Sequence, residues 1–170
     1  MRSVRIVWVG VLAAGALLVA TSSASSAATT RCHTRDLSGT LHAGSPGAGQ
    51  RYAVLVLRNR SQSTCSVAGY VGMRLLDAKG RGLPTNVVRD SAKPQRVSLR
   101  AGARASTLLH WTAIPSGSEP TSGACEPTPA KVEVTPPDET THLLVPWRLG
   151  AVCGKGRIDI LRLRAGTHGF

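Results

Sequence analysis

Short runs of apolar residues, many alternating with polar ones, recur along most of the chain between clusters of turn-forming residues. Residues 52–57 are almost continuously β-branched or aliphatic, and Ala130, Val132 and Val134 alternate with polar neighbours. Runs of this length, bounded by Gly, Pro, Asn, Asp and Ser, are typical of β-strands. The pattern predicts strands at residues 35–42, 52–57, 67–76, 83–88, 96–99, 103–111, 130–134, 142–147 and 157–163.

One of these segments and two connections need separate comment. Alternation from Ala103 to Trp111 indicates a strand, although Ala105, Leu108 and Thr112 also have helical spacing, and the surrounding strands favour the first interpretation. Residues 44–49 and 115–129 are rich in Gly, Pro and Ser, so both are expected to be loops.

Seven to nine short strands without a convincing helix predict an all-β fold, an antiparallel sandwich of immunoglobulin-like dimensions. A small closed barrel is the alternative. Tyr70 and Trp111 are expected to plug the core rather than to form a ligand platform, because large aromatic side chains bury much apolar surface. The chain length of 170 residues fits a single folded domain, placed at residues 29–170.

The first 28 residues have the order of a secretory signal peptide. Arg2 and Arg5 precede an uncharged apolar run at residues 6–20, and small residues follow up to Ala28. The apolar run is shorter than the roughly 20 residues that a membrane-spanning helix needs. We therefore expect cleavage after Ala27 or Ala28, no membrane span after cleavage, and a secreted or extracellular protein that can associate with the cell envelope.

The chain is strongly basic, and cleavage changes this little. Loss of Arg2 and Arg5 lowers the formal net charge from +12 to +10. The charge directs attention to anionic partners outside the cell, since a basic surface attracts them at long range. Nucleic acid is not an expected partner, because no segment combines basic residues with stacking aromatics.

The four cysteines, Cys32, Cys65, Cys125 and Cys153, all follow the signal peptide. An even number of cysteines in an exported protein indicates two disulfides, for which three pairings exist. We favour Cys32 with Cys65 and Cys125 with Cys153, because each half of the chain then closes its own loop. A four-cysteine zinc site is the competing interpretation, but it usually draws its ligands from closely spaced cysteine pairs, and this chain has none.

Motifs for catalysis and for cofactors are missing from the sequence. The five histidines lie on separate segments with no ligand spacing, no serine lies in a nucleophile elbow, and no glycine-rich loop ends in the residues that cradle phosphate. We expect no metal, no cofactor and no enzymatic activity.

Arginines near turns and in the last strand are the best candidates for a binding function. If the turns lie at one end of the sandwich, the guanidinium groups would hold phosphate or carboxylate groups in bidentate fashion. The alternative is a compositional bias toward arginine, spread over a solvated surface. The candidate anion-binding residues are Arg58, Arg60, Arg96, Arg100, Arg104, Arg157, Arg162 and Arg164.

Several local motifs together resemble a known family. They are Cys32, residues 52–59 (YAVLVLRN), 65–72 (CSVAGYVG), 75–80 (LLDAKG) and 97–102 (VSLRAG), Cys125, residues 132–137 (VEVTPP) and Cys153. The set resembles the domain of unknown function 4232 family of secreted and envelope proteins from actinobacteria. Asn59, Cys65, Gly69 and Tyr70 form its most specific element, although Val71 stands where the family usually has proline. The resemblance implies a β-sandwich, two disulfides and export, and it implies no reaction.

The sequence therefore predicts a secreted, non-enzymatic β-sandwich that binds an anionic envelope component or another exported protein. Two alternatives come from other classes. One is a small extracellular hydrolase whose active site is scattered along the sequence, which would need a pocket where two titratable groups converge. The other is a secreted protease inhibitor that presents the loop at residues 115–129.

Overall fold

The computed structural model describes residues 29–168, and the predicted signal peptide at residues 1–28 lies outside the described residues. The two longest strands, β2 (Gln50–Asn59) and β7 (Arg104–Thr112), pair antiparallel at the centre of the larger sheet. This sheet has the order β1-β2-β7-β10-β5, with β11 also paired to β7. Its other strands are β1 (Leu37–Ala43), β5 (Asn86–Arg89), β10 (Arg157–Ile160) and β11 (Arg164–Ala165).

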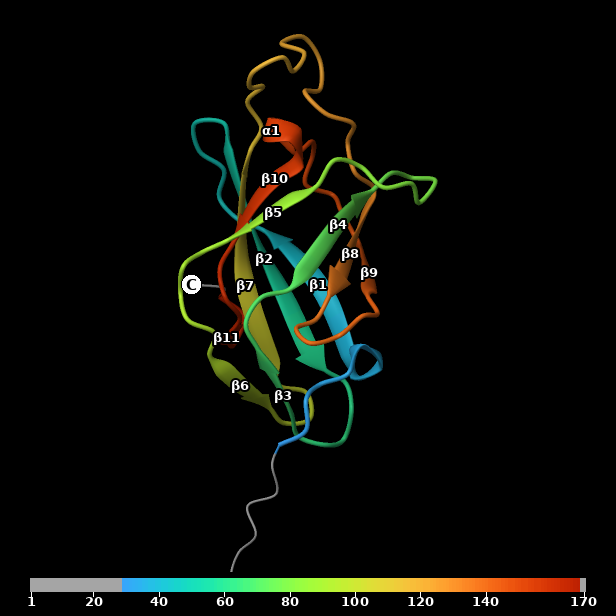
Figure 1. Cartoon of the computed structure of the whole chain (residues 1–170), viewed down its shortest axis with the longest axis vertical. Helices are drawn as coiled ribbons and strands as arrows, with labels where there is room; N and C mark the ends of the chain where they lie inside the picture. Colours follow the sequence, from blue (N-terminus) through green and yellow to red (C-terminus); the bar gives the residue numbers. More distant parts are fainter. Residues whose placement is uncertain (1–28, 169–170) are drawn as a thin grey trace, which may run out of the picture.

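Two smaller sheets form the second layer (Figure 1). One pairs β3 (Cys65–Ala68) with β6 (Arg96–Leu99), and the other contains β4 (Gly72–Leu76), β8 (Lys131–Thr135) and β9 (Leu143–Pro146) in the order β4-β8-β9. Nearly every strand pair is antiparallel, as predicted. The exception is β10, which runs parallel to β5.

The core lies between the layers because alternate residues of each strand point inward. Leu55, Leu109 and Ile158 of the larger sheet are fully buried together with Leu75 and Val132 of the second layer. Trp111 is buried as predicted, and its ring lies 5.2 Å from that of Trp147. Tyr70 packs against this core but is only partly buried. The all-β sandwich predicted from the sequence is confirmed.

The structure divides the predicted strand at residues 67–76 into two strands that belong to different sheets. Gly69 adopts a φ of +101°, which favours glycine, and the chain turns there between β3 and β4. Together with the unpredicted short β11, this division gives eleven strands within residues 29–168 rather than seven to nine. A break inside an apolar run is hard to recognise, since both halves keep the hydrophobic pattern of a strand.

Helical structure within the described residues is limited to two short elements. A 3-10 turn, η1, covers Thr34–Asp36, and the four-residue α1 covers Cys153–Gly156. Within α1, Gly154 and Lys155 both have left-handed backbone angles. Neither element within residues 29–168 has the length and apolar character that a membrane crossing requires.

Candidate functional site

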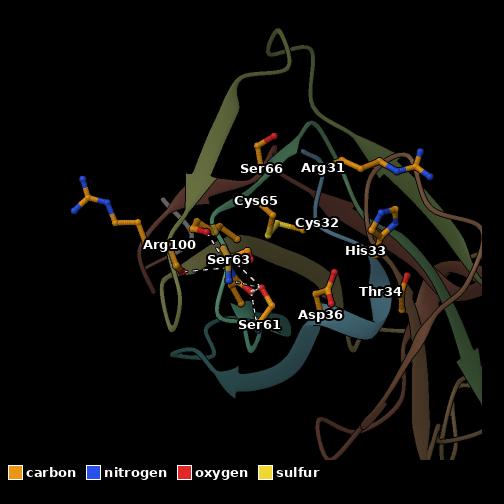
Figure 2. Close-up of a disulfide and its surroundings, with 12 residues drawn as sticks. Arg31, Cys32, His33, Thr34, Asp36, Ser61, Ser63, Cys65, Ser66 and Arg100 are labelled. Atoms are coloured by element: carbon orange, nitrogen blue, oxygen red, sulfur yellow. Dashed lines mark hydrogen bonds between the residues drawn. A yellow bond between two sulfur atoms is a disulfide. The ribbon is translucent and has the colours of Figure 1, made fainter. Parts of the chain in front are cut away.

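Two disulfides tie irregular segments to the sandwich. Cys32 bonds to Cys65 at the start of β3, with their Cα atoms 4.9 Å apart (Figure 2). Cys125 bonds to Cys153 at the start of α1, with their Cα atoms 5.5 Å apart, and thereby holds the long loop between β7 and β8. The pairs follow chain order, so each half of the chain closes its own loop.

A buried asparagine organises the turn that carries the first candidate arginines. The Asn59 side chain is completely buried, and its amide donates hydrogen bonds to the carbonyls of Ser63, at 2.8 Å, and Leu99, at 2.9 Å. Its carbonyl oxygen accepts from the hydroxyl and the backbone N–H of Ser61 (Figure 2). Because these hydrogen bonds fix the turn, the backbone of the exposed Arg58 and Arg60, on either side of Asn59, is also held in place.

Strand register places three of the candidate arginines on one face of the larger sheet. Arg58 of β2 lies directly opposite Arg104 of β7, and Arg164 of β11 lies opposite Ser106. Because Ser106 is two residues beyond Arg104, both side chains point to the same face. Arg104 and Arg164 are therefore diagonal neighbours across two strands, close enough for long side chains to meet.

Two surface grooves border the last described segment of the chain. The first, of about 560 Å³, contains Arg58, Arg104 and Thr167 in its lining, with polar side chains of β1. The second, of about 440 Å³, lies between β6 and the segment around β11. Its charged residues are Arg96, Arg162 and Arg164. We call the five arginines of the two grooves, Arg58, Arg96, Arg104, Arg162 and Arg164, the arginine surface.

The arginines within residues 29–168 divide into those with a carboxylate partner and those without one. Arg31, Arg35, Arg74, Arg81 and Arg157 each have a carboxylate within 4.0 Å. Within residues 29–168, no member of the arginine surface has such a partner, and neither groove has a carboxylate in its lining. Four of the five side chains are exposed and Arg162 is half-buried, and none of the five forms an ion pair with a described carboxylate.

The remaining candidates lie apart from the arginine surface. Arg157 contacts Asp159 at 2.8 Å, and this hydrogen bond and the carboxylate charge raise the pKa of the guanidinium. Arg60 and Arg100 are exposed near the Asn59 turn, where Arg100 points away from the disulfide (Figure 2), and they line neither groove.

One arginine of the second groove carries a buried donor without a partner. Within the part of the chain that the structure describes, the Nε of Arg162 is buried and makes no hydrogen bond. A buried donor left without an acceptor costs about 1–3 kcal/mol. Arg96, on the opposite wall, uses one guanidinium nitrogen to donate to the Ser66 hydroxyl at 3.0 Å. The Arg162 Nε is therefore the one buried side-chain donor of the described residues that the protein leaves unsatisfied.

A separate pocket of about 350 Å³ lies on the larger sheet, where β2, β5, β7 and β10 meet. The rings of Tyr52 and His110 stack with their centroids 4.8 Å apart. His110 Nδ1 is 3.7 Å from a carboxylate oxygen of Asp159, and Asp90 lines the same pocket. Asp90 accepts a hydrogen bond from Tyr70, which raises the pKa of the Tyr70 hydroxyl. Histidine and carboxylates converge here, although no Ser, Thr or Cys is among the described residues that line the pocket.

Two other carboxylates have structural roles that the sequence did not reveal. Glu119 accepts hydrogen bonds from the backbone N–H groups of Lys155, Ser116 and Gly154, which lower the pKa of its carboxyl to about 2. Glu139 accepts from the backbone N–H of Thr34 and from other polar groups of the N-terminal segment, so its pKa is also lowered. Both carboxylates anchor loops far away in the sequence.

No group of three or more His, Cys, Asp or Glu side chains within residues 29–168 is arranged to hold a metal ion.

Comparison with known proteins identifies a family. Neither the curated proteins nor the solved structures give a match. The family model described as a domain of unknown function, DUF4232, matches residues 32–167. The match includes both cysteine pairs, the Asn59 turn and all five arginines of the arginine surface. Since it covers most of the sequence, the chain belongs to the DUF4232 family.

Proposed function

We propose that the protein is an exported, non-catalytic β-sandwich that binds an anionic polymer of the cell envelope through the arginine surface. The observation that carries the proposal is the convergence of five arginines without carboxylate partners, from β2, β6, β7 and the segment at β11. Unpaired guanidinium groups attract polyanions at long range and bind their oxygens in bidentate fashion at contact. Export is supported by the two disulfides, since such bonds persist in oxidising compartments.

The test measures retention of the purified protein on isolated envelope fractions as salt is raised. Binding through released counterions falls steeply with salt, by a slope close to the number of anionic groups contacted. We expect the R58Q/R104Q/R164Q variant to bind more weakly and to reduce this slope by about two to three. The matched control is R35Q/R74Q/R81Q, which removes the same charge from exposed arginines that already have carboxylate partners.

The two variants separate local binding from bulk charge. Retention of the control at nearly the unmodified level supports a specific arginine surface. An equal loss in both variants would assign retention to net charge alone, and absence of retention at low salt would reject the polymer as partner.

The pocket at Tyr52 and His110 favours a second candidate function, a small hydrolase. It brings His110 and Asp159 together, as a general base and the carboxylate that orients it would require. A hydrolase would lose turnover of model ester or glycoside substrates in the H110Q and D159N variants, whereas the R58Q/R104Q/R164Q variant would keep it. Lack of turnover by the unmodified protein across such substrates would remove this candidate.

A further inference from the structure

We propose that the groove between β6 and β11 is a subsite for one tetrahedral oxyanion group, phosphate or sulfate, and that the neighbouring groove at Arg58 and Arg104 binds a second such group of the same polymer. This inference rests on the proposed function, because it names the chemical class of the polymer that the arginine surface would bind.

The β6–β11 groove presents donors from two opposite walls. Arg96 and Ser98 come from β6, while Arg162 and Arg164 come from the segment that ends in β11. The second wall is held in place because the backbone N–H of Leu163 donates to the Gly69 carbonyl at 2.8 Å and the Leu163 side chain is fully buried. The flanking arginines consequently start from a fixed backbone, which limits the ordering that binding requires.

The positive charge of the β6–β11 groove favours binding of an anion. Three arginines, Arg96, Arg162 and Arg164, are among the residues that line it, and no Asp or Glu is. Like charges that line one groove repel one another, and a bound anion offsets this repulsion.

The arrangement of the donors favours a tetrahedral group over a carboxylate. A carboxylate has two oxygens in one plane, and a single arginine fork satisfies both of them. Donors on opposite walls need acceptors that point in more than two directions. A sulfate ester or a terminal phosphate group has three non-bridging oxygens at the corners of a tetrahedron, so Arg96 can bind one edge while Arg162 and Arg164 bind the others.

A polymer is favoured over a single ion because the two grooves adjoin. Arg164 and Ala165 line the β6–β11 groove, and Thr167 lines the groove at Arg58 and Arg104. The strand register makes Arg104 and Arg164 diagonal neighbours on one face of the sheet. A ligand with repeated oxyanion groups can occupy both grooves, and the second contact then forms at high effective concentration.

The experiment compares anionic probes on the purified protein by calorimetry at one fixed low salt concentration. The probes are short and long sodium polyphosphates, dextran sulfate, and poly-glutamate of the same charge as the long polyphosphate. We expect the long polyphosphate and dextran sulfate to bind at least about tenfold more tightly than poly-glutamate, since one additional charge-assisted hydrogen bond gives a factor of this size.

Variants assign the two subsites. R162Q and R96Q should each weaken the short polyphosphate about tenfold, whereas R58Q should weaken only the long one. R162K keeps the positive charge but loses the two parallel N–H donors of the guanidinium. It should therefore bind the short polyphosphate as weakly as R162Q does. The control R81Q removes an exposed arginine paired with Asp77 and should change nothing. If R162Q fails to fold, R96Q on the exposed edge of β6 tests the same subsite.

The outcomes separate the two proposals. If no probe binds, the proposed function itself fails. Poly-glutamate binding as tight as that of polyphosphate and dextran sulfate would overturn the tetrahedral subsite while leaving polyanion binding intact. Equal effects of R162Q and R81Q, or an affinity independent of chain length, would also overturn it. A preference for polyphosphate over dextran sulfate, or the reverse, identifies which oxyanion the polymer carries.

Discussion

At the scale of single residues, some charged side chains stabilise the fold through hydrogen bonds to the backbone, while others have no charged partner. Glu119 belongs to the first kind, since consecutive left-handed residues at Gly154 and Lys155 turn two N–H groups toward its carboxylate. Such a concave arrangement of N–H groups binds anions. Here the anion is part of the same chain, and it fixes the loop after β7 against α1.

The Glu119 carboxylate makes stability depend on acidity. Its pKa is about 2 in the folded protein, lower than in the unfolded chain, so the stabilisation is complete above the unfolded value and is lost as pH falls toward 2. We expect E119Q to lower the urea midpoint at pH 7, with a difference from the unmodified protein that shrinks in acid. The control is E126Q, in the same loop. A pH-independent difference would show that the charge is not the cause.

The sequence identified the arginines as the candidate binding groups but did not separate paired from unpaired ones. For Arg157 a signal was present, because Arg157 and Asp159 are two residues apart in a strand and so share a face. For Arg162 and Glu119 no such signal exists. Their surroundings come from segments far away along the chain, as with Glu119 and Lys155, and only the fold brings these together.

At the scale of elements, each disulfide supports an irregular segment that few strand contacts hold. The loop between β7 and β8 extends beyond one end of the sandwich near α1 (Figure 1). Glu119 and Cys125 anchor it at two points, and residues 121–124 between them are exposed. This is the kind of constrained segment that the protease-inhibitor alternative would require.

Removal of the Cys125–Cys153 disulfide should destabilise the protein and loosen this loop. The bond joins residues 28 positions apart, for which chain entropy predicts a loss of about 3.6 kcal/mol. We expect C125S/C153S to lose about this amount in chemical denaturation and to be cut faster by proteases between residues 113 and 130.

The matched variant is C32S/C65S, whose cysteines are 33 residues apart. It should lose a similar unfolding free energy without faster cleavage of that loop. Equal cleavage of the loop in both variants would mean that global unfolding, rather than local release, exposes it.

Element type was predictable from the sequence and sheet membership was not. The alternation at residues 103–111 predicted a strand, and β7 confirms it. The apolar run at residues 67–76 conceals the change of sheet at Gly69, because hydrophobic alternation reports which face is buried and not which strand lies alongside. The short β11 has no apolar pattern from which a strand could be predicted. Burial of the preceding Leu163 side chain brings β11 alongside β7.

At the scale of the whole molecule, one continuous core joins the two layers. Trp111 of β7 and Trp147, which follows β9, meet inside it, and their indole N–H groups donate to the carbonyls of Ala151 and Gly150 in one connection. Both rings therefore report on the contact between the layers.

We expect the sandwich to unfold in a single cooperative transition. Trp111 and Trp147 are the only tryptophans of residues 29–170, the predicted mature chain. Their fluorescence should change at the same denaturant concentration as the far-ultraviolet circular dichroism of the strands. Two separate midpoints would show that the layers unfold independently.

The position of β10 has a consequence for the order of folding in time. It is the last strand of the larger sheet to be synthesised apart from the short β11, yet it lies inside the sheet, between β7 and β5. The pairing of Arg157–Ile160 with Asn86–Arg89 joins segments separated by most of the second half of the chain. A chain emerging amino terminus first from the ribosome therefore cannot close this sheet until Arg157–Ile160 are free. Until then β5 has no neighbour in this sheet, and the arrival of β10 is the step that joins β5 to the rest of it.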